Sequence, residues 1–340
     1  MTPLAITMGE PAGIGGELVL AAFEALQDEG IAMVLLDDPD RIEALGRAVG
    51  LPTRIAVVDQ PENAAAVVGA LPVLPLPQRV PLRLGTLGTA TTPAVLGAIE
   101  RAVSLAMEGR VSGVVTNPIH KAVLQDAGFS HPGHTEFLAE LAGVPRTVMM
   151  LASPELRVVP VTIHIALSEV PAALTGAAII ETARIVSDAL QRDFGVVNPR
   201  LAVAGLNPHA GEDGKMGTED RDVIAPAVAA LKAEGINAFG PLSADTMFHE
   251  RARCSYDAAL CMFHDQALIP IKTIAFDEGV NVTLGLPFVR TSPDHGTALD
   301  IAGKGVARPD SLIAAIRLAA QMSRHRTGVT GAGATVLETS

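Results

Sequence analysis

The stretch CMFHDQALIPIKTIAFDEGVNVTLGLPFVRTSPDHGTALDIAG, residues Cys261–Gly303, sets short apolar runs between isolated polar side chains. His264 stands just past a strand-like apolar run, and a loop rich in Gly and Thr extends from Thr291 to Gly303. Lys272, Asn281 and Arg290 lie between them. Polar groups of these kinds suit a phosphorylated or carboxylated small molecule beside a metal ion. We expect the rest of the chain to complete such a site.

The composition of the chain predicts a large α/β protein. At 340 residues it exceeds the usual size of one domain, so two domains are expected. Hydrophobic residues make up 49% of the chain but aromatic residues only 3%, so the cores must be aliphatic, which suits buried parallel strands. A net charge of -12 argues against a nucleic-acid partner, and no segment is long and apolar enough for a membrane span.

The cysteines and the N-terminus bear on the compartment. The two cysteines, Cys254 and Cys261, make neither a disulfide framework nor a zinc-type pair. The first basic residue is Arg41, so the N-terminus lacks the basic region of a signal peptide. Both features favour the reducing cytoplasm.

Apolar runs of strand length alternate with amphipathic segments along most of the chain. Leu4–Met8 and Val111–Thr116 are predicted strands, and Asp38 with Pro39 is a typical helix start. This β–α alternation predicts a mostly parallel sheet. Two further segments, 147–153 and 156–163, flank a tight SPE turn and predict an antiparallel hairpin.

One segment breaks the expected pattern. Leu71–Pro81 contains four prolines, so it is expected to be an edge strand or a connector rather than a central strand. The N-terminal MGEPAGIGGE lies between a predicted strand and a predicted helix. It lacks the spacing of a nucleotide-binding fingerprint and is interpreted as a tight strand-to-helix turn.

Three apolar strands each run into a histidine. VVPVTIH ends at His164, LAVAGLNPH at His209 and AALCMFH at His264. Ligands bind beyond the carboxyl ends of strands in open α/β sheets, and three protein ligands with one open position are typical of a catalytic zinc site. The alternative for each histidine is a helix cap or a loop hydrogen bond. Asp245 and Asp265 are acidic candidates to support the metal.

Several groups suit an anion. In HPGHTEF, Thr135 is predicted to cap the following helix, so His134 and Thr135 can hold a phosphate or carboxylate at a helix N-terminus, although an ordinary capped helix is an equal alternative. Arg290 and Lys272 suit the same anionic groups, whereas Arg157 is expected to be a solvated charge at a strand edge. The small residues of 292–305 allow backbone to approach a flat ligand, with His295 and Asp300 as contacts for adenine or ribose.

These residues also match the sequence motifs of a known enzyme family. The sequence resembles the 4-hydroxythreonine-4-phosphate dehydrogenases, NAD-dependent enzymes of vitamin B6 (pyridoxine) biosynthesis, from ITMGEPAGIG to DHGTALDIAGKG. The most specific segments are NPIHKAVLQDAG, GHTEF, GLNPHAGEDGKMGTE, PLSADTMF, FHDQALIPIK and GVNVTLGLPFVRTSPDHGTALDIAG. The chain departs from the family at Gly16, where a proline is usual, and this departure is expected to loosen the start of the following helix.

The resemblance implies an isocitrate/isopropylmalate dehydrogenase-like fold of two α/β/α domains with mostly parallel sheets and an active-site cleft between them. Residues 1–125 with 276–340 would form the domain that carries the cofactor loop. Residues 126–275 would form the second domain, with the metal ligands and the dimer interface. Members are homodimers that share the active site, so one metal ligand can come from the partner subunit.

The resemblance also implies roles for individual residues. A divalent metal, Zn²⁺ first and Mg²⁺ or Co²⁺ as alternatives, would be held by His164, His209 and His264. The expected substrate contacts are His134, Thr135, Lys272, Asn281 and Arg290. NAD or NADP would lie on Ser292, Asp294, His295, Gly296, Thr297, Ala298 and Asp300. The candidates for the general base are Asp245, Lys272 and a water, with Asp245 favoured.

The implied reaction oxidises 4-phosphooxy-L-threonine at C3 to a β-keto acid, which decarboxylates to 3-amino-2-oxopropyl phosphate. The nearest alternative is a paralogue that acts on 4-phospho-D-threonate or D-erythronate in sugar-acid breakdown, which the segment TIHIAL also resembles. Two alternatives come from other classes. A metal lyase or hydrolase with three histidines would leave the adenine-type loop unused, and a non-catalytic metal- or phosphate-binding module would explain little of the polar spacing.

Overall fold

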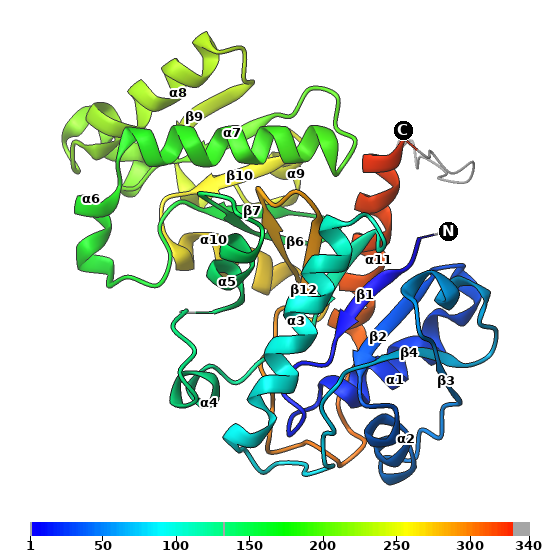
Figure 1. The fold of residues 1–340 in the computed structure, drawn as a ribbon. Helices are drawn as coiled ribbons and strands as arrows, with labels where there is room; N and C mark the ends of the chain where they lie inside the picture. The colour runs from blue at the N-terminus through cyan, green and yellow to red at the C-terminus, as the bar shows by residue number, and fades with distance from the viewer. Residues whose placement is uncertain (1, 132, 329–340) are drawn as a thin grey trace.

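The computed structural model describes residues 2–131 and 133–328, and in these residues twelve strands form one continuous sheet (Figure 1). The strand order is β3-β4-β2-β1-β5-β12-β11-β6-β7-β10-β8-β9. The strands are β1 (Leu4–Thr7), β2 (Met33–Asp37), β3 (Ile55–Val57), β4 (Leu71–Pro75), β5 (Gly113–Thr116), β6 (Val148–Ala152), β7 (Arg157–Pro160), β8 (Leu201–Ala204), β9 (Ala238–Leu242), β10 (Ala258–Cys261), β11 (Val280–Leu284) and β12 (Val289–Pro293).

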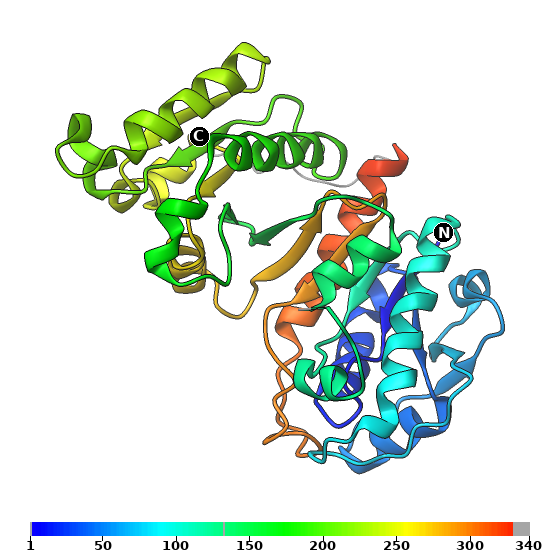
Figure 2. The ribbon, with the colours of Figure 1, turned by 60° about the vertical axis from the view of Figure 1, so that its left-hand side comes forward.

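Helices cover both faces of this sheet (Figure 2). The α-helices are α1 (Gly15–Leu26), α2 (Pro39–Ala48), α3 (Thr92–Met107), α4 (Lys121–Asp126), α5 (His134–Leu141), α6 (Val170–Ala173), α7 (Gly176–Arg192), α8 (Ala225–Ala233), α9 (Glu250–Arg253), α10 (His264–Ile274) and α11 (Asp310–Thr327). Three short turns matter for the site: the 3-10 turns η5 (Pro208–Gly214) and η7 (Ala244–Thr246), and the π-helical turn η6 (Asp220–Ile224).

The sheet consists of two parallel blocks joined by antiparallel strands. Strands β3, β4, β2, β1, β5 and β12 are mutually parallel, as are β7, β10, β8 and β9. The strand β11 pairs antiparallel with β12 and with β6, and β6 forms the predicted antiparallel hairpin with β7. The mostly parallel α/β prediction and the hairpin are therefore confirmed. The sheet continues across the expected boundaries between domains, which stay a prediction.

The proline-laced segment was predicted wrongly. Leu71–Pro75 forms β4, which lies between β3 and β2 and is therefore not an edge strand. The Leu71 N–H donates to the backbone carbonyl of Arg54, on the side of β3. The backbone N–H groups of every second residue in a strand point to the same neighbouring strand, so the nitrogen of Pro75 also faces β3. The pairing with β3 has ended by then, at Val73. The N–H that Pro75 lacks therefore removes no ladder bond.

Aliphatic side chains form the core on both faces of the strands. In β1, Leu4 and Ile6 pack into the cluster that includes α1 and α11, whereas Ala5 packs into the cluster with α3. All three side chains are buried, which is the pattern of a central parallel strand.

In the described part of the chain, no single helix is long and apolar enough to cross a membrane. One bent pair, Leu167–Ala173 with Gly176–Arg192, passes that test by length and composition. Both cysteines are free thiols, with Cys261 buried and Cys254 exposed.

Candidate active site

Two of the three predicted metal ligands lie side by side. Backbone Val161 donates to the Cys261 carbonyl over 2.8 Å, and the Thr162 hydroxyl donates to the Met262 carbonyl over 2.7 Å, so the loops after β7 and β10 run together. This pairing brings the rings of His164 and His264 to a centroid distance of 5.7 Å.

A pocket of about 240 Å³ is lined by both rings and by Asp265. The Asp265 carboxylate lies 2.7 Å from Nδ1 of His264, which orients that ring. The helix α10 begins at His264, so this side chain is held at the first position of a helix. The paired imidazoles and the supporting carboxylate match the donor set of a metal site.

His209 does not join this pair within one chain. Across residues 2–131 and 133–328, no group of three or more His, Cys, Asp or Glu side chains is close enough to hold a metal ion. The exposed His209 lies beyond β8, where it opens a run of six successive residues with positive φ, from His209 to Gly214. Four of these residues are not glycine, at a cost of about 1–2 kcal/mol each. Such strain persists only where the surroundings impose it.

Arg290 is a buried cation held between three strands. It is 3% exposed, and it donates to the hydroxyls of Thr283 on β11 (2.8 Å) and Thr116 on β5 (2.6 Å). Both acceptors are neutral, so burial lowers the pKa of Arg290 to about 10. Its Nε is buried and has no hydrogen-bond partner.

His134 and Asn281 present unpaired atoms to the same face of the sheet. Asn281 opposes Ser292 in the β11–β12 ladder, and side chains alternate, so Asn281, Thr283, Arg290 and Ser292 share one face. On the other face, Thr291 bonds to α11. Asn281 Oδ1 and His134 Nε2 are buried without partners. Such orphaned atoms are costly and rare in native structures, so this group is suited to an absent ligand.

The start of α5 adds a favourable field for an anion. The helix begins at His134 with Gly133 as its N-cap, so the prediction that Thr135 is the cap was wrong: Thr135 is the second helical residue. Burial of the His134 ring, with the positive charges of Arg290 and Lys121, holds the pKa of His134 well below its ordinary value. Free N–H groups and two cations thus converge there.

Lys121 was missed as a site residue. Its side chain lies against Gly133, where an added Cβ would meet the Lys121 Cε at 3.2 Å. The signal was available in the motif NPIHK, which precedes α4, but only the fold brings Lys121 to α5.

Lys272 and Asp245, the candidate bases, occupy different surroundings. Lys272 Nζ lies 2.8 Å from Asp294 Oδ2, which ties the substrate segment to the predicted cofactor loop. Asp245 is exposed on η7, where it accepts a 2.5 Å bond from the Ser243 hydroxyl. Since η7 packs against η5, Asp245 belongs to the part of the chain that carries His209.

The predicted cofactor loop rests on the N-terminal turn. The Ile14 N–H donates to the Thr297 carbonyl over 3.1 Å, and the Gly303 N–H donates to Glu17. A Cβ on Gly13 would come within 2.7 Å of the Thr297 carbonyl, so the turn needs glycine at that position. The strand-to-helix interpretation of this turn, between β1 and α1, is therefore confirmed.

The remaining loop residues Ser292, Asp294, Gly296, Ala298 and Asp300 lie on the same segment. His295 Nδ1 lies 3.0 Å from the Gly296 carbonyl, so in the neutral ring Nδ1 carries the proton. Its Nε2 is then an acceptor, and it is buried without a partner. Apart from its two chain neighbours, no residue of the described chain comes within 4 Å of a Cβ built on Gly296, so the loop is open at this position.

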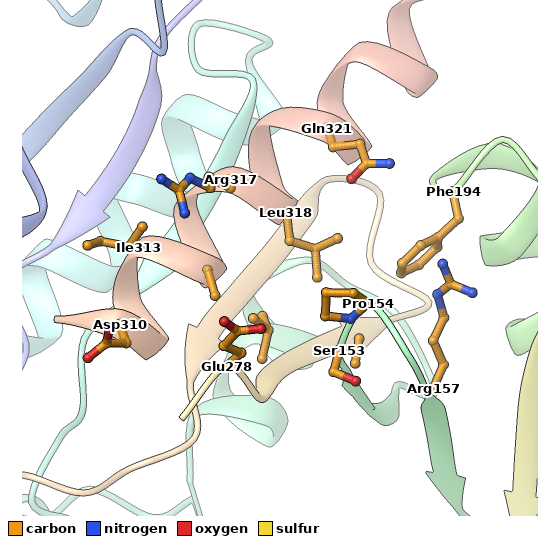
Figure 3. A pocket seen from close by; sticks show the side chains of 13 residues that line it. Ser153, Pro154, Arg157, Phe194, Glu278, Asp310, Ile313, Arg317, Leu318 and Gln321 are labelled. Atoms are coloured by element: carbon orange, nitrogen blue, oxygen red, sulfur yellow. The ribbon is translucent and has the colours of Figure 1, made fainter. Parts of the chain in front are cut away.

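A larger pocket of about 470 Å³ lies elsewhere, between α11 and the β6–β7 turn (Figure 3). It contains none of the predicted metal, substrate or cofactor residues. Arg157 lines it, and the prediction of a solvated edge charge was wrong. The Arg157 guanidinium lies 5.0 Å from the centroid of the Phe194 ring and donates a hydrogen bond to the Asp257 carbonyl. These two contacts hold the side chain against the protein instead of leaving it in solvent.

The fold is shared with a class of dehydrogenases. The structure matches the β-decarboxylating dehydrogenase of Thermococcus kodakarensis with a TM-score of 0.50 at 15% identity, over 97% of this chain and 84% of that one, a likeness of fold alone. It also matches a 4-hydroxythreonine-4-phosphate dehydrogenase from Klebsiella pneumoniae with a TM-score of 0.87 at 36% identity, over 95% of this chain and 100% of that one.

The sequence comparison gives the family. The profile described as pyridoxal phosphate biosynthetic protein PdxA matches residues 30–319. The 4-hydroxythreonine-4-phosphate dehydrogenase of Methylorubrum populi is 58% identical over 331 residues, which cover 95% of each chain. The chain belongs to the PdxA family of pyridoxal phosphate biosynthetic proteins. This assignment confirms the resemblance found in the sequence.

Proposed function

We propose that this protein is a 4-hydroxythreonine-4-phosphate dehydrogenase of pyridoxal phosphate biosynthesis. It oxidises 4-phosphooxy-L-threonine at C3, and the resulting β-keto acid loses CO2 to give 3-amino-2-oxopropyl phosphate. Beside the family assignment, one observation carries the proposal: the buried, unpaired atoms of His134, Asn281 and Arg290. A small molecule with phosphate, carboxylate and amino groups supplies the acceptors and donors that these atoms lack.

The substrate is held by residues of the central strands β11 and β12 and of the helices beside them. Arg290, Lys121 and the N-terminus of α5 favour an anionic group, and Thr135 offers a hydroxyl beside them. Lys272, which pairs with Asp294 of the cofactor loop, adds a third cation. Asn281 Oδ1 accepts from the substrate's amino or hydroxyl group. Together they fix the position of C3, which turns an encounter into an oriented reaction.

His164 and His264, with Asp265 behind them, fit a divalent cation, and Zn²⁺ is the first candidate ahead of Mg²⁺ or Co²⁺. The loop from Ser292 to Asp300 fits the adenosine half of NAD or NADP, because His295 Nε2 can accept from the adenine amino group. When bound, the cation supplies Lewis acidity toward the C3 hydroxyl and the nicotinamide ring accepts the hydride. Asp245 is the favoured acceptor of the hydroxyl proton, with Lys272 or a water as alternatives.

The site is proposed to be shared in a homodimer. His209 completes the metal site of the partner subunit, since the pair His164–His264 lacks a third ligand within the described chain. Large apolar side chains lie exposed in the segments that carry or follow the three histidines, and monomers rarely expose such a group. They are Ile165 (41% exposed), Leu167 (68%), Met216 (45%), Ile269 (63%) and Phe276 (74%).

A steady-state panel tests the proposal. The purified protein, loaded with Zn²⁺, Co²⁺ or Mg²⁺, is given NAD or NADP with 4-phosphooxy-L-threonine, 4-phospho-D-threonate or 4-phospho-D-erythronate. Formation of reduced cofactor and of CO2 with the L-threonine phosphate is expected. No turnover of this substrate with any metal and cofactor refutes the proposal, and equal or faster turnover of a D-substrate reassigns the chain to sugar-acid breakdown.

A further inference from the structure

A buried carboxylate binds the chain at the start of the loop that carries His209. Asp220, 1% exposed, begins the π-helical turn η6. Its Oδ1 accepts from the Leu206 N–H over 2.8 Å, and its Oδ2 accepts from the Asn207 N–H over 3.1 Å. These two residues are the last of the chain before η5, so the carboxylate fixes where the left-handed run begins.

The Asn207 side chain extends this contact. Its Nδ2 donates to Asp220 Oδ2 over 2.9 Å and to Glu219 Oε2 over 2.8 Å. The fit around both groups is tight, because a Cβ on Gly205 would meet Asp220 Oδ1 at 2.6 Å and one on Gly217 would meet Asn207 Nδ2 at 2.5 Å. The beginning and the end of the loop are therefore closed on the same two side chains.

A left-handed run of this length needs such a constraint. His209 and Ala210 have φ of 52° and 50°, which non-glycine residues adopt only when their surroundings impose it. The ring of His209 is exposed and makes no hydrogen bond in the described chain, so its place depends on the backbone that carries it. The Asp220 contacts fix the start of that backbone segment.

We propose that Asp220 is a positioning residue for metal binding: its carboxylate, with Asn207, holds the left-handed loop that presents His209. This inference rests on the proposed metal site. Asp220 touches neither substrate nor metal, and it acts by keeping the third imidazole where a metal in the partner subunit needs it. Outer residues that orient metal ligands typically change metal affinity about 10–100-fold.

The test compares metal affinity in Asp220→Asn with a matched control. Asn keeps the shape of Asp but puts an NH₂ group against backbone N–H donors. The control is Asp193→Asn, since Asp193 is also 1% exposed and holds two arginines, Arg192 and Arg326, with no contact to the histidine loop. Metal-free dimers are titrated with Co²⁺, and the visible absorption gives the dissociation constant and the ligand geometry.

We expect a rise of about 10-fold or more in the Co²⁺ dissociation constant of Asp220→Asn, with an altered spectrum. Asp193→Asn is expected to lower the melting temperature but keep wild-type Co²⁺ binding. Wild-type affinity and spectrum in Asp220→Asn overturn the inference. An equal loss of affinity in Asp193→Asn also overturns it, since general destabilisation then explains the effect.

Two further variants complete the test. If Asp220→Asn does not form folded dimers, Asn207→Ala removes the side-chain part of the contact at a half-buried position, and unchanged Co²⁺ binding in that variant overturns the inference. His209→Ala separates the two levels of the proposal. If this variant loses Co²⁺ affinity while Asp220→Asn keeps it, the metal site stands and the inference fails alone. If His209→Ala keeps wild-type affinity, the metal site and the inference fail together.

Discussion

Mixing of two inactive variants is expected to restore activity if the site is shared between subunits. His209→Ala keeps His164 and His264, and His264→Ala keeps His209. In a hybrid dimer of these two chains, one site has all three histidines and the other lacks two of them. Each parent homodimer lacks one ligand in both sites and is expected to be inactive.

The magnitude follows from the arrangement of the rings. His164 and His264 lie 5.7 Å apart in one chain, and no third ligand joins them within the described residues. A purified hybrid therefore has one complete site in two and is expected to show about half of the wild-type activity per dimer. The two chains carry different affinity tags, the hybrid is isolated through both tags, and reduced cofactor is followed by absorbance.

The control pairs two ligands from the same chain. A hybrid of His164→Ala with His264→Ala has one histidine missing from each site, so it is expected to stay inactive. Activity in this control, or none in the His209→Ala/His264→Ala hybrid despite a confirmed dimer, refutes the shared site. If all three ligands came from one chain, neither hybrid would recover.

Three further variants address substrate binding and packing. Arg290→Met removes a buried charge whose partners are neutral, so the free protein should keep or gain up to about 2 kcal/mol of stability while kcat/KM falls at least about 100-fold; a large fall in melting temperature contradicts this. Because the pKa of His134 is depressed, the unfolded chain binds the proton first, and stability should fall as pH drops below about 6.5, by at most about 1.4 kcal/mol per pH unit. Urea unfolding at pH 7.5 and 5.5 should show a smaller loss in His134→Asn, and an equal loss excludes this cause. Gly16→Pro should cost about 1–3 kcal/mol, because its Cβ would meet Leu45 Cδ2 at 2.5 Å, and Leu45→Val should recover part of that loss in thermal unfolding.

Local patterns predicted most of the fold. The β–α alternation and the SPE turn act over a few residues, and the strands and the hairpin form where these patterns indicated. The error at Leu71–Pro75 has another origin: a proline is excluded only where its missing N–H faces a paired neighbour, and that depends on how far β3 extends. Such register information is not present in the segment itself. The cap of α5 was misplaced for a related reason, because the extended Gly133 caps the helix two residues before Thr135, the residue that the side chains indicate.

The expected effect of Gly16 also changes once packing is known. The sequence predicted a looser helix start, because a first-turn proline is absent. In the structure, Leu45 of α2 occupies the space beside Gly16, so the missing ring is compensated by a neighbouring side chain. Packing between α1 and α2 offsets what the local rule predicts.

The strongest evidence for the site is that local rules fail where its residues gather. Buried polar atoms without partners are uncommon, yet three of them occur on His134, Asn281 and Arg290. A left-handed backbone is costly, yet it begins at His209 and recurs at His164. Exposed Leu167 and Phe276 lie in the segments that carry the paired histidines. Stability of the isolated chain explains none of these features, whereas a bound ligand and a partner subunit would account for all of them, and this is the basis for proposing a functional unit larger than one chain.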